Sequence, residues 1–338
     1  MTTDLSGDIR WGILATGKIA HSFATDLALV PDARLAAVGS RSVGSARAFA
    51  DQHGGRAHGS YADLVGDPEV DVVYVASPHA LHLEHVALAL DAGKHVLCEK
   101  PLTVTVAESM EMLALARQHD RFLMEAMWTA CHPVVRAVAE GLRAGRFGRP
   151  RHLHAELGFR VEADPGDRML DPALGASALL DMGIYPLTLA HLLLGEAITL
   201  HATAELSDRG IDLDVAIAGR YPGGALATMN ASMTSWSTRS ASLATDLGRL
   251  ELSDFHHPTS ATFTPYDVRS GRGGGRGAAI DLTAEADPVI GKGYAHEIIE
   301  VHRCLRAGLR ESPLVPHEQT LTLMRQMEAL LEQIHQGD

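Results

Sequence analysis

The stretch Ile9 to Ala20, which reads IRWGILATGKIA, decides the fold of the N-terminal half. Its first seven residues predict a short apolar strand that runs directly into a tight turn and the start of a helix. The turn has the spacing of the dinucleotide-binding fingerprint, with Ala15 in the first glycine place, Gly17 in the second and Ala20 in the third. Such a turn exposes a helix N-terminus, whose backbone N–H groups can bind a pyrophosphate. Taken alone, the stretch is explained equally well by a plain strand-to-helix turn.

The residues after this turn favour the dinucleotide-binding interpretation. Four further apolar strands, separated by helices, are predicted at 35–39, 70–76, 95–98 and 122–125. These strands do not alternate polar and apolar residues, which is typical of a parallel sheet buried on both faces. Ligands of such sheets bind at the carboxyl ends of the strands, where distinctive polar groups stand in this chain. We therefore expect an α/β fold whose N-terminal domain is a Rossmann doubly wound parallel sheet.

The pattern changes after residue 150, where several stretches alternate with period two. This alternation predicts an antiparallel sheet with one face covered by helices. We place a NAD(P)-binding domain at 1–126 and a C-terminal α/β domain at 127–338, with a role in substrate binding and oligomerisation. Two helices predicted at 294–307 and 317–335 can pack back on the first domain.

Composition restricts the function classes. The chain has 338 residues, with 42 acidic and 29 basic residues and a formal net charge of −13. This balance argues against nucleic acid or a membrane surface as partner, because both require a basic footprint. Only Cys98, Cys131 and Cys304 occur, without disulfide or zinc spacing, and no apolar run approaches the ~20 residues of a membrane span. We expect a cytoplasmic protein.

The end of the second strand predicts the cofactor. An acidic residue there would bind the ribose hydroxyls of NAD, but this chain has Ser40, Arg41 and Ser42. A guanidinium and two hydroxyls suit a 2′-phosphate, so NADP is expected in preference to NAD. The alternative is that Arg41 is an ordinary solvated arginine.

Lys100 is the first catalytic candidate. The sequence Glu99-Lys100-Pro101 follows an apolar strand directly, so Lys100 is expected at the ligand-binding edge of the sheet. A lysine that is partly desolvated beside a cationic nicotinamide should have a lowered pKa, which suits proton transfer.

Three segments together resemble the Gfo/Idh/MocA oxidoreductase family: Gly12 to Ala20, Ala92 to Pro101 and Leu180 to Tyr185. The resemblance covers nearly the whole chain, and its lysine-bearing segment is the specific part. Met124 to Trp128, together with the Asp-x-Gly-x-Tyr segment, resembles the branch of dimeric dihydrodiol dehydrogenases and NADP-dependent D-xylose dehydrogenases. The resemblance implies a C-terminal domain with an open, mostly antiparallel sheet and a homodimer or homotetramer.

The resemblance also implies the catalytic residues. Lys100 matches the family's catalytic lysine, Asp181 its substrate-handling aspartate, and Tyr185 a position that is tyrosine in this branch. Residues four apart share a helix face, so Asp181 and Tyr185 can address one substrate. The alternatives are a capping aspartate and a half-buried core tyrosine. The chain departs from the family pattern at two places, Gly175 to Ala178 and Ala130. These departures place the identity of the substrate in doubt more than the reaction type.

The full set of candidate site residues extends this core. Trp128 can stack on substrate or nicotinamide, or can equally be a core residue between domains. His79, His82 and His85 lack an accompanying carboxylate cluster, so no metal site is expected. The residues expected to bind the cofactor are Gly12, Thr16, Gly17, Lys18, Ile19, Ser40, Arg41, Ser77, Pro78, His79, His82, Glu99, Lys100 and Trp128. Those expected to bind substrate are Lys100, Trp128, Phe159, Asp181 and Tyr185.

The reaction expected from this set moves hydride between NADP and a sugar-like hydroxyl or carbonyl, with Lys100 transferring the proton. Oxidation of an aldose at C1 is the first choice. A dihydrodiol dehydrogenase or a dicarbonyl or sugar reductase is the second, and a non-catalytic NADP-binding sensor is the alternative of another class. Nucleic-acid binding through the Arg272 to Arg276 loop is disfavoured by the net charge.

Overall fold

The computed structural model describes residues 7–162, 168–267 and 275–336. The chain forms two compact units, one of residues 1–128 with 290–324 and the other of residues 129–289 with 325–338. The division lies two residues beyond the predicted boundary, and residues 290–324 belong to the first unit. Most of the Gly271 to Gly277 loop lies outside the described residues.

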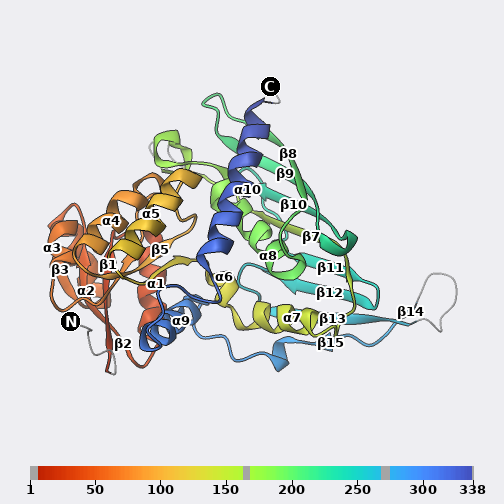
Figure 1. Cartoon of the computed structure of the whole chain (residues 1–338), viewed down its shortest axis with the longest axis horizontal. Helices are drawn as coiled ribbons and strands as arrows, with labels where there is room; N and C mark the ends of the chain where they lie inside the picture. The colour runs from red at the N-terminus through yellow and green to blue at the C-terminus, as the bar shows by residue number, and fades with distance from the viewer. Residues whose placement is uncertain (1–6, 163–167, 268–274, 337–338) are drawn as a thin grey trace. The chain divides into compact units, whose positions relative to one another are not determined.

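The first unit contains a six-stranded parallel sheet, in the order β3-β2-β1-β4-β5-β6 (Figure 1). The predicted Rossmann fold class is confirmed. The short strand β3 was missed, because its three residues contain no apolar run. The strands are β1 (Ile9–Leu14), β2 (Ala33–Gly39), β3 (Arg56–His58), β4 (Val72–Val75), β5 (His95–Glu99) and β6 (Leu123–Ala126). The helices that follow them are α1 (Lys18–Leu27), α2 (Val43–His53), α3 (Tyr61–Val65), α4 (His82–Asp91) and α5 (Val106–Gln118).

Both faces of this sheet are covered, as its continuous apolar strands predict. On one face, Trp11 of β1 packs edge-on against Phe23 of α1, with ring centroids 5.5 Å apart. On the other face, Val73 belongs to a buried apolar cluster with Val86 of α4 and Met112 of α5. Every residue of β4 and β6 is buried.

Helix α9 (Tyr294–Arg306) belongs to the first unit although it lies far along the chain. The buried carboxylate of Asp26, on α1, accepts hydrogen bonds from the backbone N–H groups of Lys292, Gly293 and Tyr294 at 2.8–3.1 Å. The N–H groups of Gly293, the N-cap residue, and Tyr294, the first residue of α9, are among the donors that a helix N-terminus leaves unsatisfied, so Asp26 caps α9 from another element. The indole N–H of Trp11 also faces His302 Nε2, at 2.9 Å.

The second unit contains a nine-stranded sheet among its described residues, in which β10 and β7 are parallel and the other pairs are antiparallel. The predicted mostly antiparallel sheet is confirmed. Helix α8 (Ile184–Leu194) packs against β7 and β10. The order is β14-β13-β12-β11-β7-β10-β9-β8, with β15 beside β13. The strands are β7 (Pro150–Gly158), β8 (Thr199–Leu206), β9 (Asp212–Arg220), β10 (Leu226–Ser232), β11 (Ala241–Thr245), β12 (Gly248–Ser253), β13 (Ser260–Asp267), β14 (Gly275–Arg276) and β15 (Ile280–Asp281). The remaining helices longer than one turn are α7 (Pro133–Arg143) and α10 (His317–Gln336), of which α10 crosses the boundary between the units.

The expectation that no apolar run approaches membrane-spanning length is wrong for Pro172–Leu194. This segment of 23 residues is long and apolar enough to cross a membrane by length and composition alone. However, 89% of its most apolar window is buried inside the structure. Its composition is therefore that of a helix whose whole circumference is packed in a protein core.

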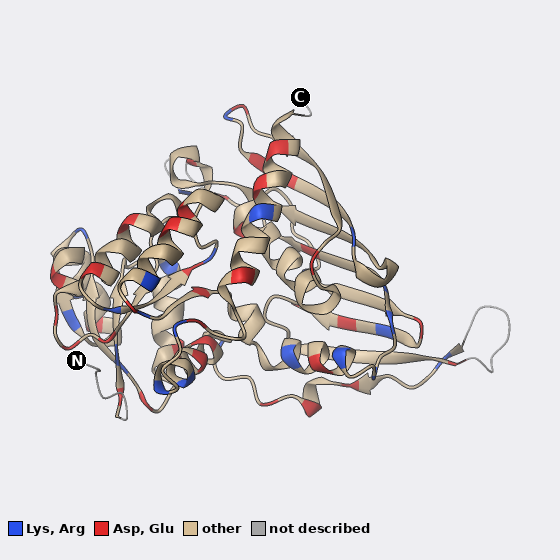
Figure 2. Ribbon diagram, in the orientation of Figure 1, with Lys and Arg blue, Asp and Glu red and all other residues tan. Residues whose placement is uncertain are grey.

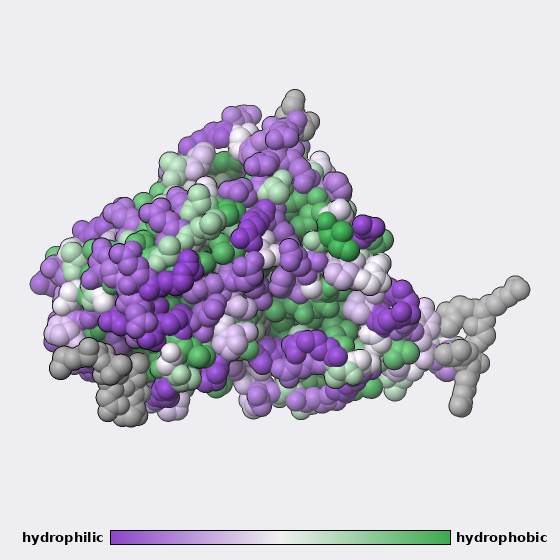
Figure 3. Space-filling view, in the orientation of Figure 1, coloured by the Kyte–Doolittle hydropathy of each residue, from purple (hydrophilic) through white to green (hydrophobic). Residues whose placement is uncertain are grey.

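The surface carries mixed charge. In Figure 2, α5 and α10 each carry an arginine as well as acidic residues, whereas the charged residues of α4 are acidic. The same face is mainly hydrophilic over α4 and α5 in Figure 3. On this face the basic residues are dispersed, in agreement with the negative net charge.

Candidate cofactor and catalytic site

The turn between β1 and α1 presents a helix N-terminus. Gly17 is the N-cap residue of α1, and it makes no side-chain capping bond. A Cβ atom built on Gly17 would have nothing within 4 Å, so the space in front of the helix is open. Thr16 and Ile19 are half-buried beside it, and Lys18 is exposed. The uncapped N–H groups of the first turn suit the pyrophosphate of a dinucleotide.

Gly12 has a different role from Gly17. It lies inside β1, and a Cβ atom there would approach Val70 Cγ1 to 2.9 Å and Leu64 Cδ1 to 3.3 Å. The structure therefore explains Gly12 by close packing between the strand and its covering elements.

Ala15 occupies the first glycine place of the turn in a left-handed conformation, with φ of 78°. This conformation costs a residue with a Cβ atom roughly 1–2 kcal/mol relative to glycine. Replacement of Ala15 by glycine should therefore raise the free energy of unfolding by about 1 kcal/mol, after allowing for the more flexible unfolded chain. Urea denaturation measures this change. The control Ala20→Gly, inside α1, should lower stability by about 1 kcal/mol. A loss of stability in Ala15→Gly would contradict the strain assignment.

The carboxyl end of β2 carries the residues expected to select NADP. Ser40 is buried and its Oγ lies 3.5 Å from the Oγ1 of Thr16, which links the ends of β1 and β2. Arg41 is exposed, and its charge acts on Tyr61 and His85. Burial lowers the pKa of His85, and the positive charge of Arg41 lowers it further. An exposed guanidinium close to an open helix N-terminus is a donor set that fits a 2′-phosphate.

Histidine side chains contact the segment that follows β4. His82 has no exposed surface; its Nε2 lies 2.9 Å from the carbonyl oxygen of Ser77, and its Nδ1 lies 3.0 Å from that of Pro101. Burial lowers the pKa of His82 to about 4. His82 therefore connects the segments that follow β4 and β5. His85 Nδ1 lies 2.8 Å from the Ser77 hydroxyl, and His79 is also buried, beside the half-exposed Pro78.

Lys100 follows the last residue of β5 and is half-buried. The Glu99 carboxylate accepts a hydrogen bond from the Lys100 backbone N–H at 3.2 Å and another from the Tyr74 hydroxyl. The peptide bond between Lys100 and Pro101 is cis. Glu99 therefore fixes the backbone from which the Lys100 side chain extends.

Sequence reasoning missed two buried carboxyl groups in this region. Glu125, on β6, is 3% exposed, and Glu297, on α9, is 0% exposed. Burial raises the pKa of Glu125 to about 7 and that of Glu297 well above its usual value, and the negative charge of Glu99 adds to both shifts. Buried acids with such shifts cluster at functional sites. Only Glu125 gave a signal in the sequence, as a charged residue that interrupts the last apolar strand.

Trp128 lies in the first unit, where its ring stacks on Tyr294 with centroids 4.3 Å apart and planes inclined by 9°. The side chain is 7% exposed. One face of the indole is thus covered by protein, so only the opposite face or the edge can meet a ligand.

The second unit holds Asp181 and Tyr185 on one continuous helical segment. Asp181 lies in a π-helical turn, η4 (Leu179–Gly183), which leads into α8, and Tyr185 is the second residue of α8. The guanidinium of Arg168 donates to Asp181 Oδ1 at 3.4 Å, and the ring of Tyr185 meets that of His256 edge-on at 5.5 Å. A π-helical turn in an α-helix is often found at functional sites. The sequence had no signal for Arg168 or His256.

Asp212 fixes the start of this segment. Its Oδ2 accepts hydrogen bonds from the Leu179 backbone N–H at 2.7 Å and from the Ser177 hydroxyl at 3.0 Å. Burial raises the pKa of this carboxyl. Asp212 therefore positions the turn that carries Asp181.

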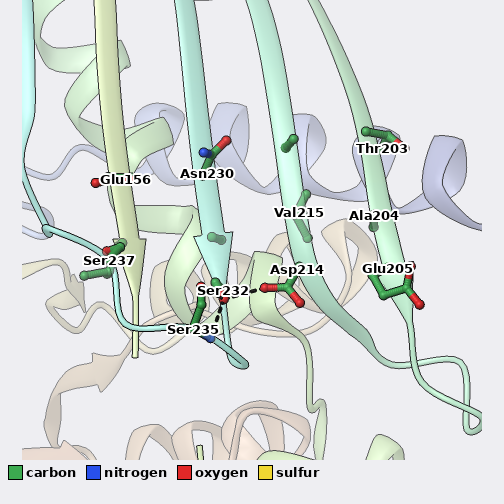
Figure 4. A pocket seen from close by; sticks show the side chains of 13 residues that line it. Glu156, Thr203, Ala204, Glu205, Asp214, Val215, Asn230, Ser232, Ser235 and Ser237 are labelled. Carbon is green, nitrogen blue, oxygen red and sulfur yellow. Dashed lines mark hydrogen bonds between the residues drawn. The ribbon is translucent and has the colours of Figure 1, made fainter. Parts of the chain in front are cut away.

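Phe159 follows β7 and is 42% exposed, so its ring is accessible in the second unit. The sheet of this unit also carries an open hollow, in which Ser232 donates to Asp214 and accepts from the Ser235 backbone N–H (Figure 4). Asp181, Tyr185 and Phe159 are not among the residues that line this hollow. The hollow is therefore separate from the predicted substrate residues of this unit.

Comparison with known proteins gives matches over most of the chain. Residues 9–127 match the GFO_IDH_MocA model, described as an oxidoreductase family with a NAD-binding Rossmann fold, and residues 135–252 match the GFO/IDH/MocA C-terminal domain. The D-xylose 1-dehydrogenase (NADP(+)) of Hypocrea jecorina is 33% identical, over 96% of this chain and 92% of that protein. The trans-1,2-dihydrobenzene-1,2-diol dehydrogenase of Mus musculus is 34% identical, over 91% of both chains. Among solved structures, a 3-ketoreductase from Actinomadura kijaniata in complex with NADP and TDP-benzene has a TM-score of 0.82 and 27% identity, over 98% of both chains.

Proposed function

Because the chain belongs to the Gfo/Idh/MocA oxidoreductase family, we propose that it oxidises a sugar-like substrate with NADP+, an aldose at C1 being preferred. The family resemblance noted in the sequence is confirmed, as is the expectation of an NAD(P)-dependent dehydrogenase or reductase that acts on CH–OH groups. The proposal of an aldose rests on a single observation: a half-buried lysine, Lys100, follows β5 in a chain similar to a D-xylose 1-dehydrogenase.

Each of the proposed residues has a separate role in the reaction. When bound, NADP+ would supply the hydride acceptor, so that the C–H bond of the substrate carbon would break with its electron pair passing to the nicotinamide. Lys100 takes the proton of the hydroxyl group on that carbon, and a carbonyl group forms. Tyr185 donates a hydrogen bond to the same oxygen, and Asp181 orients the neighbouring hydroxyls. Trp128 and Phe159 supply apolar surface for the substrate.

The pyrophosphate and 2′-phosphate of the cofactor have separate binding groups in this proposal. Gly17, Lys18 and the open N-terminus of α1 bind the pyrophosphate, while Ser40 and Arg41 bind the 2′-phosphate. Ser77, Pro78 and His79 line the cofactor near the end of β4, with His82 behind them.

Arg41→Ala should weaken binding of NADP+ by about 10- to 100-fold, because charge-assisted hydrogen bonds to the 2′-phosphate are lost. The affinity for NAD+ should stay within about threefold, since NAD+ lacks that phosphate. Isothermal titration calorimetry with both nucleotides measures the two constants. The control Arg47→Ala removes another exposed arginine, on α2, and should change neither. Equal losses for NADP+ and NAD+ would refute the assignment of Arg41.

The second candidate function is a trans-dihydrodiol dehydrogenase, or a dicarbonyl or sugar reductase. The similarity to the mouse dihydrodiol dehydrogenase favours it. A panel of aldoses, polyols, inositols and a trans-dihydrodiol, assayed with NADP+ and NAD+ by nicotinamide absorbance, separates these activities. Turnover of aldoses supports the proposal, and turnover of the dihydrodiol alone supports the second candidate. Tight NADP binding without turnover in either direction would favour a sensor.

We further propose a cytoplasmic homodimer or homotetramer. Support for an assembly comes from the sheet of the second unit, where exposed side chains alternate with half-buried ones along β8 and with buried ones along β10 and part of β9. Such a face can pack against its equivalent in a second copy. Multi-angle light scattering should give a multiple of the 36.1 kDa chain mass, and a monomer at micromolar concentration would refute the assembly.

A further inference from the structure

Glu125 lies on β6, opposite Cys98 in the neighbouring strand β5. Its Oε1 accepts a hydrogen bond from the backbone N–H of Leu102 at 2.9 Å, and its Oε2 accepts one from the Thr320 hydroxyl at 2.9 Å. Leu102 is two residues beyond Lys100, and Thr320 is in α10. The carboxyl group therefore holds the segment that carries Lys100 and connects it to the part of α10 that belongs to the first unit.

Charged groups near Glu125 act on its carboxyl group electrostatically. Lys100 and Glu99 act on it electrostatically, and Glu125 acts in turn on the Cys98 thiol. Burial and the charge of Glu99 raise the pKa of Glu125, whereas the hydrogen bonds from Thr320 and Leu102 and the charge of Lys100 lower it. The balance is a pKa of about 7. Glu125 thus changes charge within the pH range of an ordinary dehydrogenase assay.

The state of this carboxyl group matters to Lys100 because the interaction between two groups is reciprocal. A carboxylate stabilises a nearby ammonium and makes it hold its proton more tightly, whereas a neutral carboxyl group does not. Both groups are at least half-buried, so solvent screens the interaction less than at an exposed pair.

We propose that Glu125 is a positioning residue, which fixes the segment Lys100-Pro101-Leu102 and through its own charge sets how readily Lys100 releases its proton. The inference rests on the proposed function in one respect, namely that Lys100 is the proton-transfer group. Glu125 itself does not need to contact the substrate or the cofactor.

The variant Glu125→Gln tests this with little change in shape. Glutamine can accept from Leu102 through Oε1 and donate to the Thr320 hydroxyl through Nε2, because a hydroxyl is both donor and acceptor. The variant therefore keeps both contacts and removes only the charge. A second variant, Thr320→Val, keeps the carboxyl group but removes a hydrogen bond that favours its ionised form. The control Glu111→Gln removes an exposed carboxylate from α5.

The kinetic readout is the pH profile of kcat/KM in the oxidative direction. The rate rises with pH as Lys100 becomes neutral. In Glu125→Gln the rising limb should move to lower pH by on the order of one unit, so the rate below the midpoint increases by up to about tenfold. Thr320→Val should move the limb in the same direction by less, and Glu111→Gln should leave it in place.

A second readout does not depend on activity. The chain contains four lysines, Lys18, Lys94, Lys100 and Lys292, so reductive ¹³C-methylation gives a simple NMR spectrum. The Lys100 signal is identified by its loss in Lys100→Met. Its titration midpoint should fall in Glu125→Gln and, to a smaller extent, in Thr320→Val, while the other three signals keep their midpoints.

A Lys100 midpoint that is unchanged in a folded Glu125→Gln protein would overturn the inference, whatever its activity. If Glu125→Gln does not fold, an unchanged Lys100 titration midpoint in Thr320→Val would overturn the inference instead. By contrast, full activity of Lys100→Met would overturn the proposed function, and the NMR result would still show whether Glu125 controls the charge of Lys100. The two failures are therefore distinguishable.

Discussion

Lys100→Met should lower kcat by about 10²–10⁴-fold, since removal of the proton-transfer group costs an amount of this order. Methionine has a similar length but cannot take the proton of the substrate hydroxyl. Binding of NADP+ should stay within about threefold, because the phosphate-binding groups are elsewhere on the sheet edge. Steady-state kinetics on the best substrate of the panel, with NADP+ affinity measured by calorimetry, checks both expectations.

Two further variants define what Lys100 does. Lys100→Arg keeps a positive charge that is not lost at ordinary pH, so it should be as inactive as Lys100→Met if proton transfer is the role. Lys292→Met replaces an exposed lysine and should be fully active. High activity in Lys100→Arg would instead assign an electrostatic role to the lysine.

Asp26→Ala should lower the free energy of unfolding by about 3–5 kcal/mol. The substitution removes a buried acceptor of three backbone N–H groups at the start of α9, and it leaves those donors unsatisfied. Urea denaturation followed by circular dichroism measures the loss, and the melting temperature should fall by on the order of 10 °C.

Asp26→Asn and Asp51→Ala complete the test. Asparagine keeps one acceptor oxygen without the charge, so its effect should lie between those of the wild type and Asp26→Ala. Asp51 is exposed on α2, and its replacement should change stability by less than about 0.5 kcal/mol. A loss in Asp26→Ala no larger than that in Asp51→Ala would show that the carboxylate does not stabilise the cap.

Most of the Rossmann sheet could be predicted from the sequence because its strands are buried on both faces. The runs ending at Leu14, Gly39, Val75, Glu99 and Ala126 contain few polar residues, and short polar turns follow them. Strand β3 has the sequence Arg-Ala-His and gives no such signal. Its position beside β2 depends on parallel pairing of Ala37 to Gly39 with residues 56–58, which a local pattern cannot show.

Less of the candidate site than of the fold could be predicted from the sequence. Lys100 could be proposed from the sequence because a charged residue directly follows a buried strand and precedes proline. The role proposed for Glu125 could not, because it depends on Thr320, which is 195 positions away in the chain. Similarly, the cap of α9 by Asp26 requires tertiary contacts, since Asp26 looks like an ordinary helical aspartate in the sequence.

In the second unit, the local structure around Asp181 and Tyr185 could also not be predicted from the sequence. The spacing of Asp181 and Tyr185 predicted a shared helix face, but it did not reveal that the segment changes from a π-helical turn to an α-helix at Ile184. Nor did it show that Asp212, from a strand, fixes the start of this turn. Both features involve a turn that contacts β7, β9 and β10 of the sheet, which are distant in the sequence.

The contact between Asp26 and α9 also has a consequence for synthesis on the ribosome. Asp26 and Lys292 are 266 positions apart, so at about 5–20 residues per second the carboxylate has no native partner for roughly 13–53 s after it is made. During this time the parallel sheet can form, but the face that receives α9, including Trp11, lacks its covering helix. The nascent first unit therefore exposes apolar surface until nearly the whole chain has been translated, and it is completed only after the entire sheet of the second unit has left the ribosome's catalytic centre.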